Sequence, residues 1–151
     1  IKNGSGFFQH GHTYLGHPMA AAAANAVLDV LLNDNILKNV NNSGDHLKDT
    51  LRAKFAQHVH VGDIRGRGLF YGLEIVQDRE SKEPFPSSYG IARKSKSVAK
   101  DKGLLCYPMS GTVDGKKGDH VLLAPPYIIN ETEINNLSTL LAESLDEAIE
   151  S

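Results

Sequence analysis

A loop of glycines and histidines that runs directly into an alanine-rich segment constrains the fold of this chain most. Residues 10–19 read HGHTYLGHPM, and five consecutive alanines and a run of valines and leucines follow. This composition predicts a helix from Pro18 to about Leu32, whose largely apolar surface indicates burial on most sides. Pro18 suits the first helical turn because its missing N–H would have no partner there.

The entrance to this helix is a candidate anion site. Unpaired backbone N–H groups and the helix dipole favour a phosphate or carboxylate at such a place. Thr13 offers a hydroxyl and His12 a ring N–H, while Gly11 and Gly16 let the backbone approach a ligand. Two alternatives remain open: a zinc site of three histidines, which has no acidic residue or cysteine nearby, and a plain helix-entry loop. Of these two, the zinc site is the weaker, and we expect no metal.

The rest of the chain alternates helical and strand patterns. Two helices, two strands, a helix, two strands and a final helix predict an α+β fold: a small, mainly antiparallel sheet with helices on one face. The expected elements are an amphipathic helix from Ile36 to Phe55, or a continuation of the first helix; strand structure over 61–76 with a bend or bulge at 66–68; a helix over 89–102 capped by Gly103; strands at 104–107 and 120–124; and a helix capped by Asn130 and Glu133.

Two further segments carry charged residues that are candidates for a functional site. In Arg65-Gly66-Arg67-Gly68, an arginine can bind a ligand carboxylate through two parallel hydrogen bonds. Alternatively, an arginine can pair with Asp63 or Glu74 and stabilise the bend. We favour the structural role. Asp119 and His120 are a weak candidate for a catalytic dyad, and simple strand capping is the better interpretation.

Composition excludes several classes of partner. The chain has 151 residues, a formal net charge of −2 and no basic stripe, which argues against nucleic acid. No apolar run is long enough to span a bilayer, so no membrane is expected. The single cysteine, Cys106, excludes an internal disulfide, reads as a buried thiol and points to the cytoplasm. The chain begins without methionine, in a loop, and is expected to be a piece of a longer protein.

Four collinear segments resemble one enzyme family. HGHTYLGHPMAAAAANAVLDVL, VGDIRGRGLFYGLEIV, KGLLCYP and GDHVLLAPPYIINETEI look like the C-terminal part of class III (omega-type) aminotransferases, pyridoxal 5′-phosphate enzymes of fold type I. The resemblance implies a homodimer in which Thr13, with His12 beside it, binds the cofactor phosphate in the partner's active site. It also implies that residues 1–17 end the large cofactor domain, 18–34 form an interdomain helix and 35–151 form the small C-terminal domain.

The resemblance further implies the chemistry. Such enzymes move an amino group from an amine or ω-amino acid to pyruvate or another 2-oxo acid, using a lysine that belongs upstream of this chain. We therefore expect no catalytic residue here and no activity of the chain alone. Many relatives have an arginine where this chain has Tyr107, so Tyr107 is expected to line the substrate pocket. Any carboxylate clamp must then come from Arg65, Arg67 or the upstream region.

Two alternatives stay open beside this interpretation. Within the family, the runner-up is the diamine-forming enzyme of biotin synthesis, adenosylmethionine-8-amino-7-oxononanoate aminotransferase. Outside it, the rival is a non-catalytic α+β module that binds a phosphorylated ligand or a partner protein.

Overall fold

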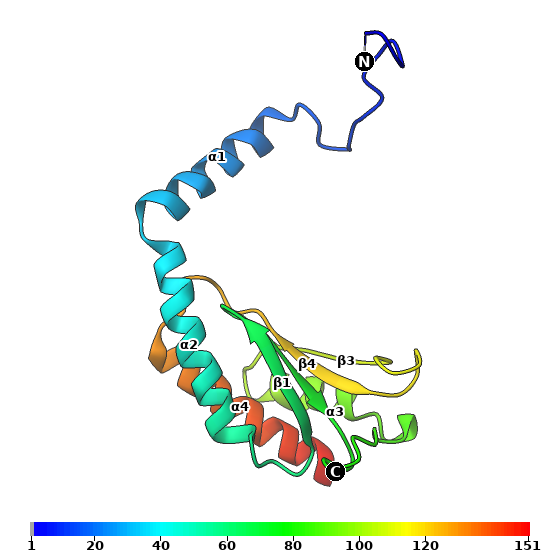
Figure 1. Ribbon diagram of the computed structural model, residues 1–151. Helices are drawn as coiled ribbons and strands as arrows, with labels where there is room; N and C mark the ends of the chain where they lie inside the picture. Colours follow the sequence, from blue (N-terminus) through cyan, green and yellow to red (C-terminus); the bar gives the residue numbers. More distant parts are fainter. Residues whose placement is uncertain (1) are drawn as a thin grey trace. The chain divides into compact units, whose positions relative to one another are not determined.

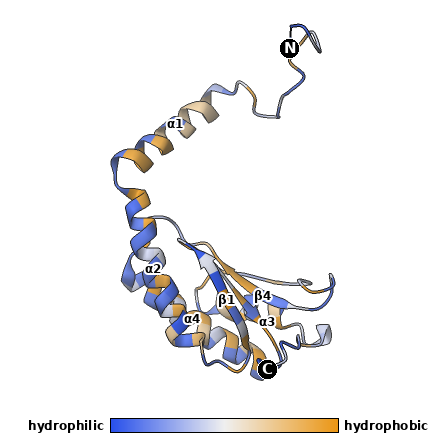
Figure 2. Ribbon diagram, viewed as in Figure 1, coloured by the Kyte–Doolittle hydropathy of each residue, from blue (hydrophilic) through white to orange (hydrophobic). Residues whose placement is uncertain are grey.

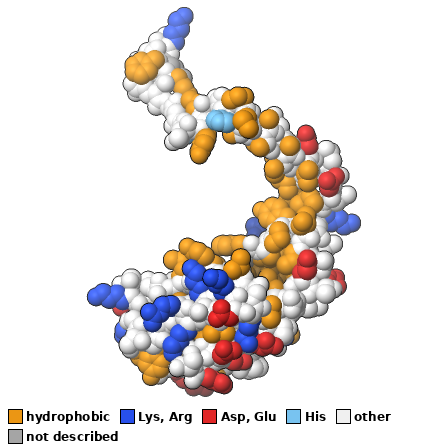
Figure 3. All heavy atoms as spheres, turned by 180° about the vertical axis from the view of Figure 1, so that it is seen from behind, with side chains coloured by type: hydrophobic (Ala, Val, Ile, Leu, Met, Phe, Trp, Pro, Cys, Tyr) orange, Lys and Arg blue, Asp and Glu red, His pale blue; other side chains and the backbone are white. Residues whose placement is uncertain are grey.

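The computed structural model describes residues 2–151, which form two compact units, the first ending at Ile36 and the second spanning Leu37–Ser151 (Figure 1). The first unit contains the glycine-rich loop and helix α1 (Pro18–Asn33), as predicted. No residue of α1 is buried, and apolar side chains such as Met19, Val27 and Leu32 are exposed. The hydrophobic residues of α1 are visible in Figures 2 and 3. The expected burial on most sides is therefore not found within residues 2–151.

A distinct break separates α1 from the next helix, α2 (Ile36–Phe55). Asp34 caps the end of α1, and Asn35 follows with a left-handed φ of 56°. Asparagine tolerates this conformation better than most residues. The sequence left open whether one helix continues through this point, and the structure has two.

The second unit is a four-stranded antiparallel sheet with helices on one face, which confirms the α+β prediction (Figure 1). The strand order is β1-β2-β4-β3. Helices α2, α3 and α4 contribute buried side chains to one hydrophobic cluster, which also holds Tyr71, Leu73 and Ile75 of β2 and Val121 and Leu123 of β4. The bounds are β1 Val61–Arg67, β2 Phe70–Ile75, α3 Ile91–Asp101, β3 Tyr107–Ser110, β4 Asp119–Leu123 and α4 Glu131–Glu150, with a short 3-10 turn at Ser87–Tyr89.

The predicted bend near residue 67 is a complete chain reversal. Strands β1 and β2 form a hairpin in which Arg67 pairs with Phe70 across Gly68 and Leu69. Gly68 has a φ of +56°, which glycine adopts without strain. A Cβ on Gly44 of α2 would lie 2.6 Å from the Gly68 carbonyl carbon, so the helix approaches the hairpin tip at backbone distance.

The strand expected at 104–107 lies three residues later, at Tyr107–Ser110. The Leu104 N–H donates to the Ala99 carbonyl at 2.7 Å, so Leu104 still terminates α3, and Gly103 takes the left-handed conformation predicted for it (φ +86°). Pro108 is tolerated because β3 is an edge strand.

The start of α4 follows the sequence pattern closely. The Asn130 side chain accepts from the Glu133 N–H at 3.0 Å, and the Glu133 carboxylate accepts from the Asn130 N–H at 2.9 Å. This reciprocal pair is the predicted capping box. Within residues 2–151, no helix combines the length and the apolar character that crossing a bilayer would require.

Candidate functional site

The histidine and glycine loop is shaped by two tight turns before α1. The Leu15 N–H donates to the His12 carbonyl at 3.0 Å, and the His17 N–H donates to the Tyr14 carbonyl at 3.1 Å. His17 is the N-cap of α1, because its Nδ1 accepts from the Ala20 N–H at 3.2 Å. One N–H of the first helical turn is thus satisfied within the protein, so an anion at this loop depends more on the turn around Thr13 than on the helix end.

Thr13 and His12 lie exposed in the first of these turns. Within residues 2–151, neither side chain makes a hydrogen bond to another part of the chain. A hydroxyl and a ring N–H free to donate fit a phosphate group, which presents only acceptor oxygens. The residues present are therefore compatible with the cofactor phosphate that the family resemblance implies.

The three histidines of the loop do not assemble a metal centre. Across the described residues, no three histidine, cysteine, aspartate or glutamate side chains are placed to share a metal ion. His17 uses its Nδ1 to cap α1, and His10 packs its ring edge-on to Phe8 with centroids 5.6 Å apart. The loop thus gives no support to the zinc alternative.

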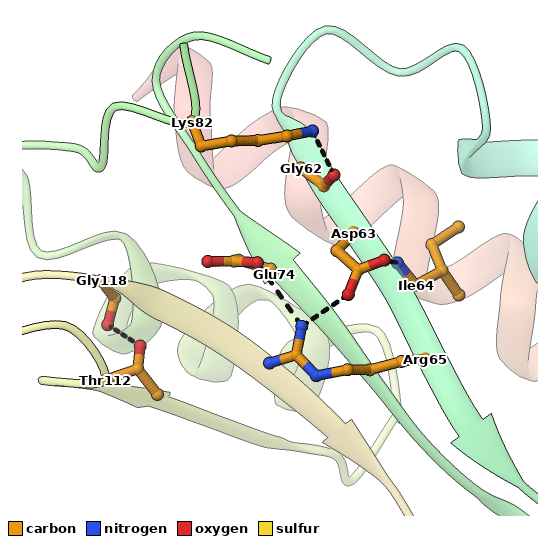
Figure 4. Close-up of polar contacts among 8 residues, drawn as sticks. All are labelled: Gly62, Asp63, Ile64, Arg65, Glu74, Lys82, Thr112 and Gly118. Atoms are coloured by element: carbon orange, nitrogen blue, oxygen red, sulfur yellow. Dashed lines mark hydrogen bonds and ion pairs between the residues drawn. The ribbon is translucent and has the colours of Figure 1, made fainter. Parts of the chain in front are cut away.

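Arg65 lies on the open face of the sheet, the face away from the helices, and joins two carboxylates there (Figure 4). Its Nη1 donates to Asp63 at 2.6 Å and to Glu74 on the neighbouring strand at 3.5 Å. The hydrogen bond from Arg65 lowers the pKa of Asp63 below its ordinary value, and the same bond raises the pKa of Arg65. This is the pairing that the sequence suggested as a lock on the bend, with Arg65 as its arginine.

Tyr107 begins edge strand β3 with its side chain exposed, opposite Leu122 of β4. The two residues line a groove of about 360 Å³ together with Phe70 and the neighbouring Cys106. Cys106 is half-buried, and burial raises the pKa of its thiol, which disfavours the reactive thiolate. The buried thiol predicted at Cys106 is thus only partly enclosed.

The structure does not bring together the side chains of Asp119 and His120, the weaker of the two interpretations of this pair. Successive strand residues point to opposite faces, and Asp119 is buried on the helix-covered face, where it accepts from the Ala92 N–H of α3 at 3.4 Å. Burial raises the pKa of Asp119. His120 lines a groove on the open face instead. The aspartate thus binds the start of α3, rather than its own strand or His120.

The predicted site residues fall in both units. Thr13 and His12 belong to the first unit, whereas Arg65 and Tyr107 belong to the second, on strands that the sheet register places on the same face. The sequence did not point to Phe70, Gly72 and Leu122, which lie on the same face of the sheet as Arg65 and Tyr107. The only signal was their alternation with buried neighbours along β2 and β4.

Comparison with known proteins places these motifs in one family. The family model for class-III aminotransferases matches residues 1–145. An uncharacterised aminotransferase of Schizosaccharomyces pombe is 42% identical over 145 residues, covering 96% of this chain and 31% of that relative. Adenosylmethionine-8-amino-7-oxononanoate aminotransferase of Methanocaldococcus jannaschii is 35% identical over 139 residues, covering 92% of this chain and 28% of that protein.

Solved structures agree with the sequence comparison. The PMP-bound form of an aminotransferase from Vibrio fluvialis superposes with a TM-score of 0.83 at 30% identity, covering 96% of this chain and 30% of the other. The chain thus spans less than a third of the length of each of these three proteins. Because the family model and these relatives match nearly the whole chain, the chain belongs to the class-III aminotransferase family.

Proposed function

We propose that this chain is part of an enzyme that transfers an amino group from an amine or ω-amino acid to pyruvate or another 2-oxo acid. The observation that carries the proposal is the family match over residues 1–145, from the Thr13 loop into α4. Pyridoxal 5′-phosphate is the cofactor of this proposal, and it supplies the electron sink of the reaction when bound. Support comes from the Vibrio fluvialis aminotransferases, whose structures are described as PMP-bound and PLP-bound.

Thr13, with His12 beside it, donates to the cofactor phosphate in this proposal. The support is the exposed turn with its two unused donors. We propose that the site belongs to the partner subunit of a cytoplasmic homodimer of fold type I. Residues 1–17 then end the large domain, 18–34 cross between domains and 35–151 form the small domain. The exposed apolar surface of α1 supports this arrangement, because such surface requires a cover.

The cofactor proposal is tested in the full-length protein by titrating the apoenzyme with pyridoxal phosphate and recording the absorbance of the bound cofactor. A hydrogen bond to a charged group contributes about 1.5–3 kcal/mol, so Thr13→Ala is expected to weaken binding roughly 10-fold or more. Thr13→Ser keeps the hydroxyl and serves as the control. Equal affinity of Thr13→Ala and the wild type would contradict the role of Thr13, and a wild type that binds no cofactor would contradict the enzyme proposal itself.

Subunit sharing has its own test. In a mixed dimer of a Thr13→Ala subunit and a subunit lacking the upstream lysine, one active site would combine the intact lysine of the first with Thr13 of the second. Mixing the two weakly active variants is therefore expected to restore activity. No restoration in mixed dimers would place Thr13 at its own subunit's cofactor. The 151-residue chain alone is expected to show no transamination.

A second candidate reaction is supported by the relative from Methanocaldococcus jannaschii, which is an adenosylmethionine-8-amino-7-oxononanoate aminotransferase. Turnover of the full-length protein with adenosylmethionine as donor, compared with simple ω-amino acids and pyruvate, separates the two candidates.

A further inference from the structure

The open face of the sheet carries a row of residues that come together only through strand register. Tyr107 of β3 pairs with Leu122 of β4, Leu122 pairs with Gly72 of β2, and Gly72 pairs with Arg65 of β1. Arg67 lies two residues beyond Arg65, on the same face and opposite Phe70. The row therefore begins at two arginines and ends at the tyrosine proposed to line the substrate pocket.

Gly72 leaves a gap in the middle of this row. Because it has no side chain, the sheet surface between Arg65 and Leu122 is hollowed into a trough of about 500 Å³. The trough is lined by Arg65, Arg67, Phe70, Glu74, His120 and Leu122, among others. Phe70 and Leu122 also line the groove at Tyr107, so the trough and this groove are adjacent on the sheet. Phe70, Gly72 and Leu122 form the apolar part of the trough floor, Glu74 and His120 line the trough on the central strands, and its two arginines lie at the β1 end.

The two arginines at that end differ in their partners. Arg65 already has Asp63 and Glu74 within 4 Å, and a ligand carboxylate would compete with both. Arg67 is exposed and has no acidic partner within residues 2–151. It also lines a second groove, beside Phe70 and Tyr127. Of the two, Arg67 is thus the guanidinium with its fork available to an incoming carboxylate.

The width of the sheet sets the size of the ligand. From β1 to β4 there are two inter-strand spacings, roughly 10 Å in total, and Gly72 and Leu122 form an apolar floor across them. A ligand that reaches from Arg67 towards Tyr107 needs an acidic end and an unbranched apolar body. An ω-amino acid several methylenes long has both, whereas a short substrate would leave the floor uncovered.

We propose that Arg67 is a specificity-determining residue that binds the distal carboxylate of an elongated ω-amino acid, whose methylene chain lies over Gly72 between Phe70 and Leu122. Arg65 is a positioning residue that joins β1 to β2 beside it. The assignment of the ligand as an amino donor rests on the proposed function. The carboxylate site itself does not, since it can bind an unreactive acid.

The first experiment measures binding without catalysis. Isothermal titration of the full-length protein with pentanoate is expected to show binding that Arg67→Gln weakens roughly 10- to 100-fold, the range of a charge-assisted, bidentate contact. Arg67→Lys keeps the charge without the fork and is expected to recover part of the loss. Arg93→Gln, which removes an exposed arginine of α3, is the matched control and is expected to leave the affinity unchanged.

The second experiment compares 5-aminopentanoate with pentylamine, which has the same chain without the carboxylate, in the donor half-reaction of the loaded enzyme. Arg67→Gln is expected to reduce kcat/KM roughly 10- to 100-fold for the acid, mainly through KM, and to leave pentylamine unchanged. An equal effect on both donors, no effect on either, or a larger loss in Arg65→Gln would overturn the role of Arg67. A wild type that binds pentanoate but converts neither donor would instead contradict the proposed function.

Discussion

Two glycines of the β1–β2 hairpin are expected to respond to the same substitution with opposite signs. At Gly72, a new Cβ would lie 3.4 Å from Leu122 Cδ2 and 3.9 Å from the Arg65 carbonyl oxygen, which is close to ordinary contact. At Gly66, it would lie 2.6 Å from two ring atoms of buried Tyr71 and closer still to the Phe70 carbonyl oxygen. The room available for a Cβ therefore decides whether the substitution stabilises or destabilises the hairpin.

The magnitudes follow from these contacts. Gly72→Ala restricts the unfolded chain without a native clash and is expected to stabilise the hairpin by about 0.4–1 kcal/mol. Gly66→Ala must displace the Tyr71 ring or the backbone of β2, and overpacking of this kind costs about 1–3 kcal/mol. Converted to equilibrium constants for local opening, these free energies predict that backbone amides of the hairpin are protected from hydrogen exchange roughly two- to fivefold more in Gly72→Ala. In Gly66→Ala, the same amides are expected to be protected roughly five- to 150-fold less.

The assay is hydrogen exchange of backbone amides in the full-length protein, read on peptides that cover residues 61–75. Exchange reports local stability inside a large protein, where a single unfolding transition is not defined. Peptides from α3 serve as an internal reference that neither substitution should change. Protection that moves in the same direction for both variants would refute the reasoning from local space.

Three further predictions concern single side chains. Asn130→Ala is expected to lower protection in the first turn of α4 by about 1 kcal/mol, because the cap to the Glu133 N–H is lost, whereas exposed Asn136→Ala should not. Because Arg65 lowers the pKa of Asp63, the ionised carboxylate stabilises the hairpin at any pH above 3.8, the ordinary pKa of this group. This stabilisation is lost as the pH falls through the lowered pKa. Asp63→Asn should therefore reduce the loss of hairpin protection at acid pH, measured by hydrogen exchange corrected for intrinsic rates. Tyr107→Phe is expected to change the relative kcat/KM of several amine donors more than cofactor affinity, and identical kinetics for all of them would argue against a place in the pocket.

The elements with strong local signals could be predicted from the sequence. Helices α1 and α4 follow from alanine content, from apolar spacing and from the Asn130 and Glu133 capping box, all of which act within a few residues. The pairing of Arg65 was also foreseeable, since Asp63 lies on the same face of β1, two residues away. Local chemistry therefore fixed most element boundaries to within one or two residues.

The features that depend on distant residues could not be predicted. The strand at 104–107 was misplaced because an apolar run after a helix looks like a strand, while Leu104 in fact closes the end of α3. His17 as the N-cap was missed because histidine is not among the residues preferred there. The trough needs Arg67, Gly72 and Leu122 in register, and no local pattern encodes the pairing of four strands.

The position of α4 in the chain has a consequence for how the second unit folds during synthesis. Ile134, Leu141 and Leu145 of α4 are fully or almost fully buried in the same cluster as Leu51 and Phe55 of α2. The β1–β2 hairpin closes over a short sequence distance and can form early, but its apolar face has no complete cover until α4 has left the ribosome. We therefore expect chaperones that shield exposed apolar surface to bind nascent chains that end between β4 and α4.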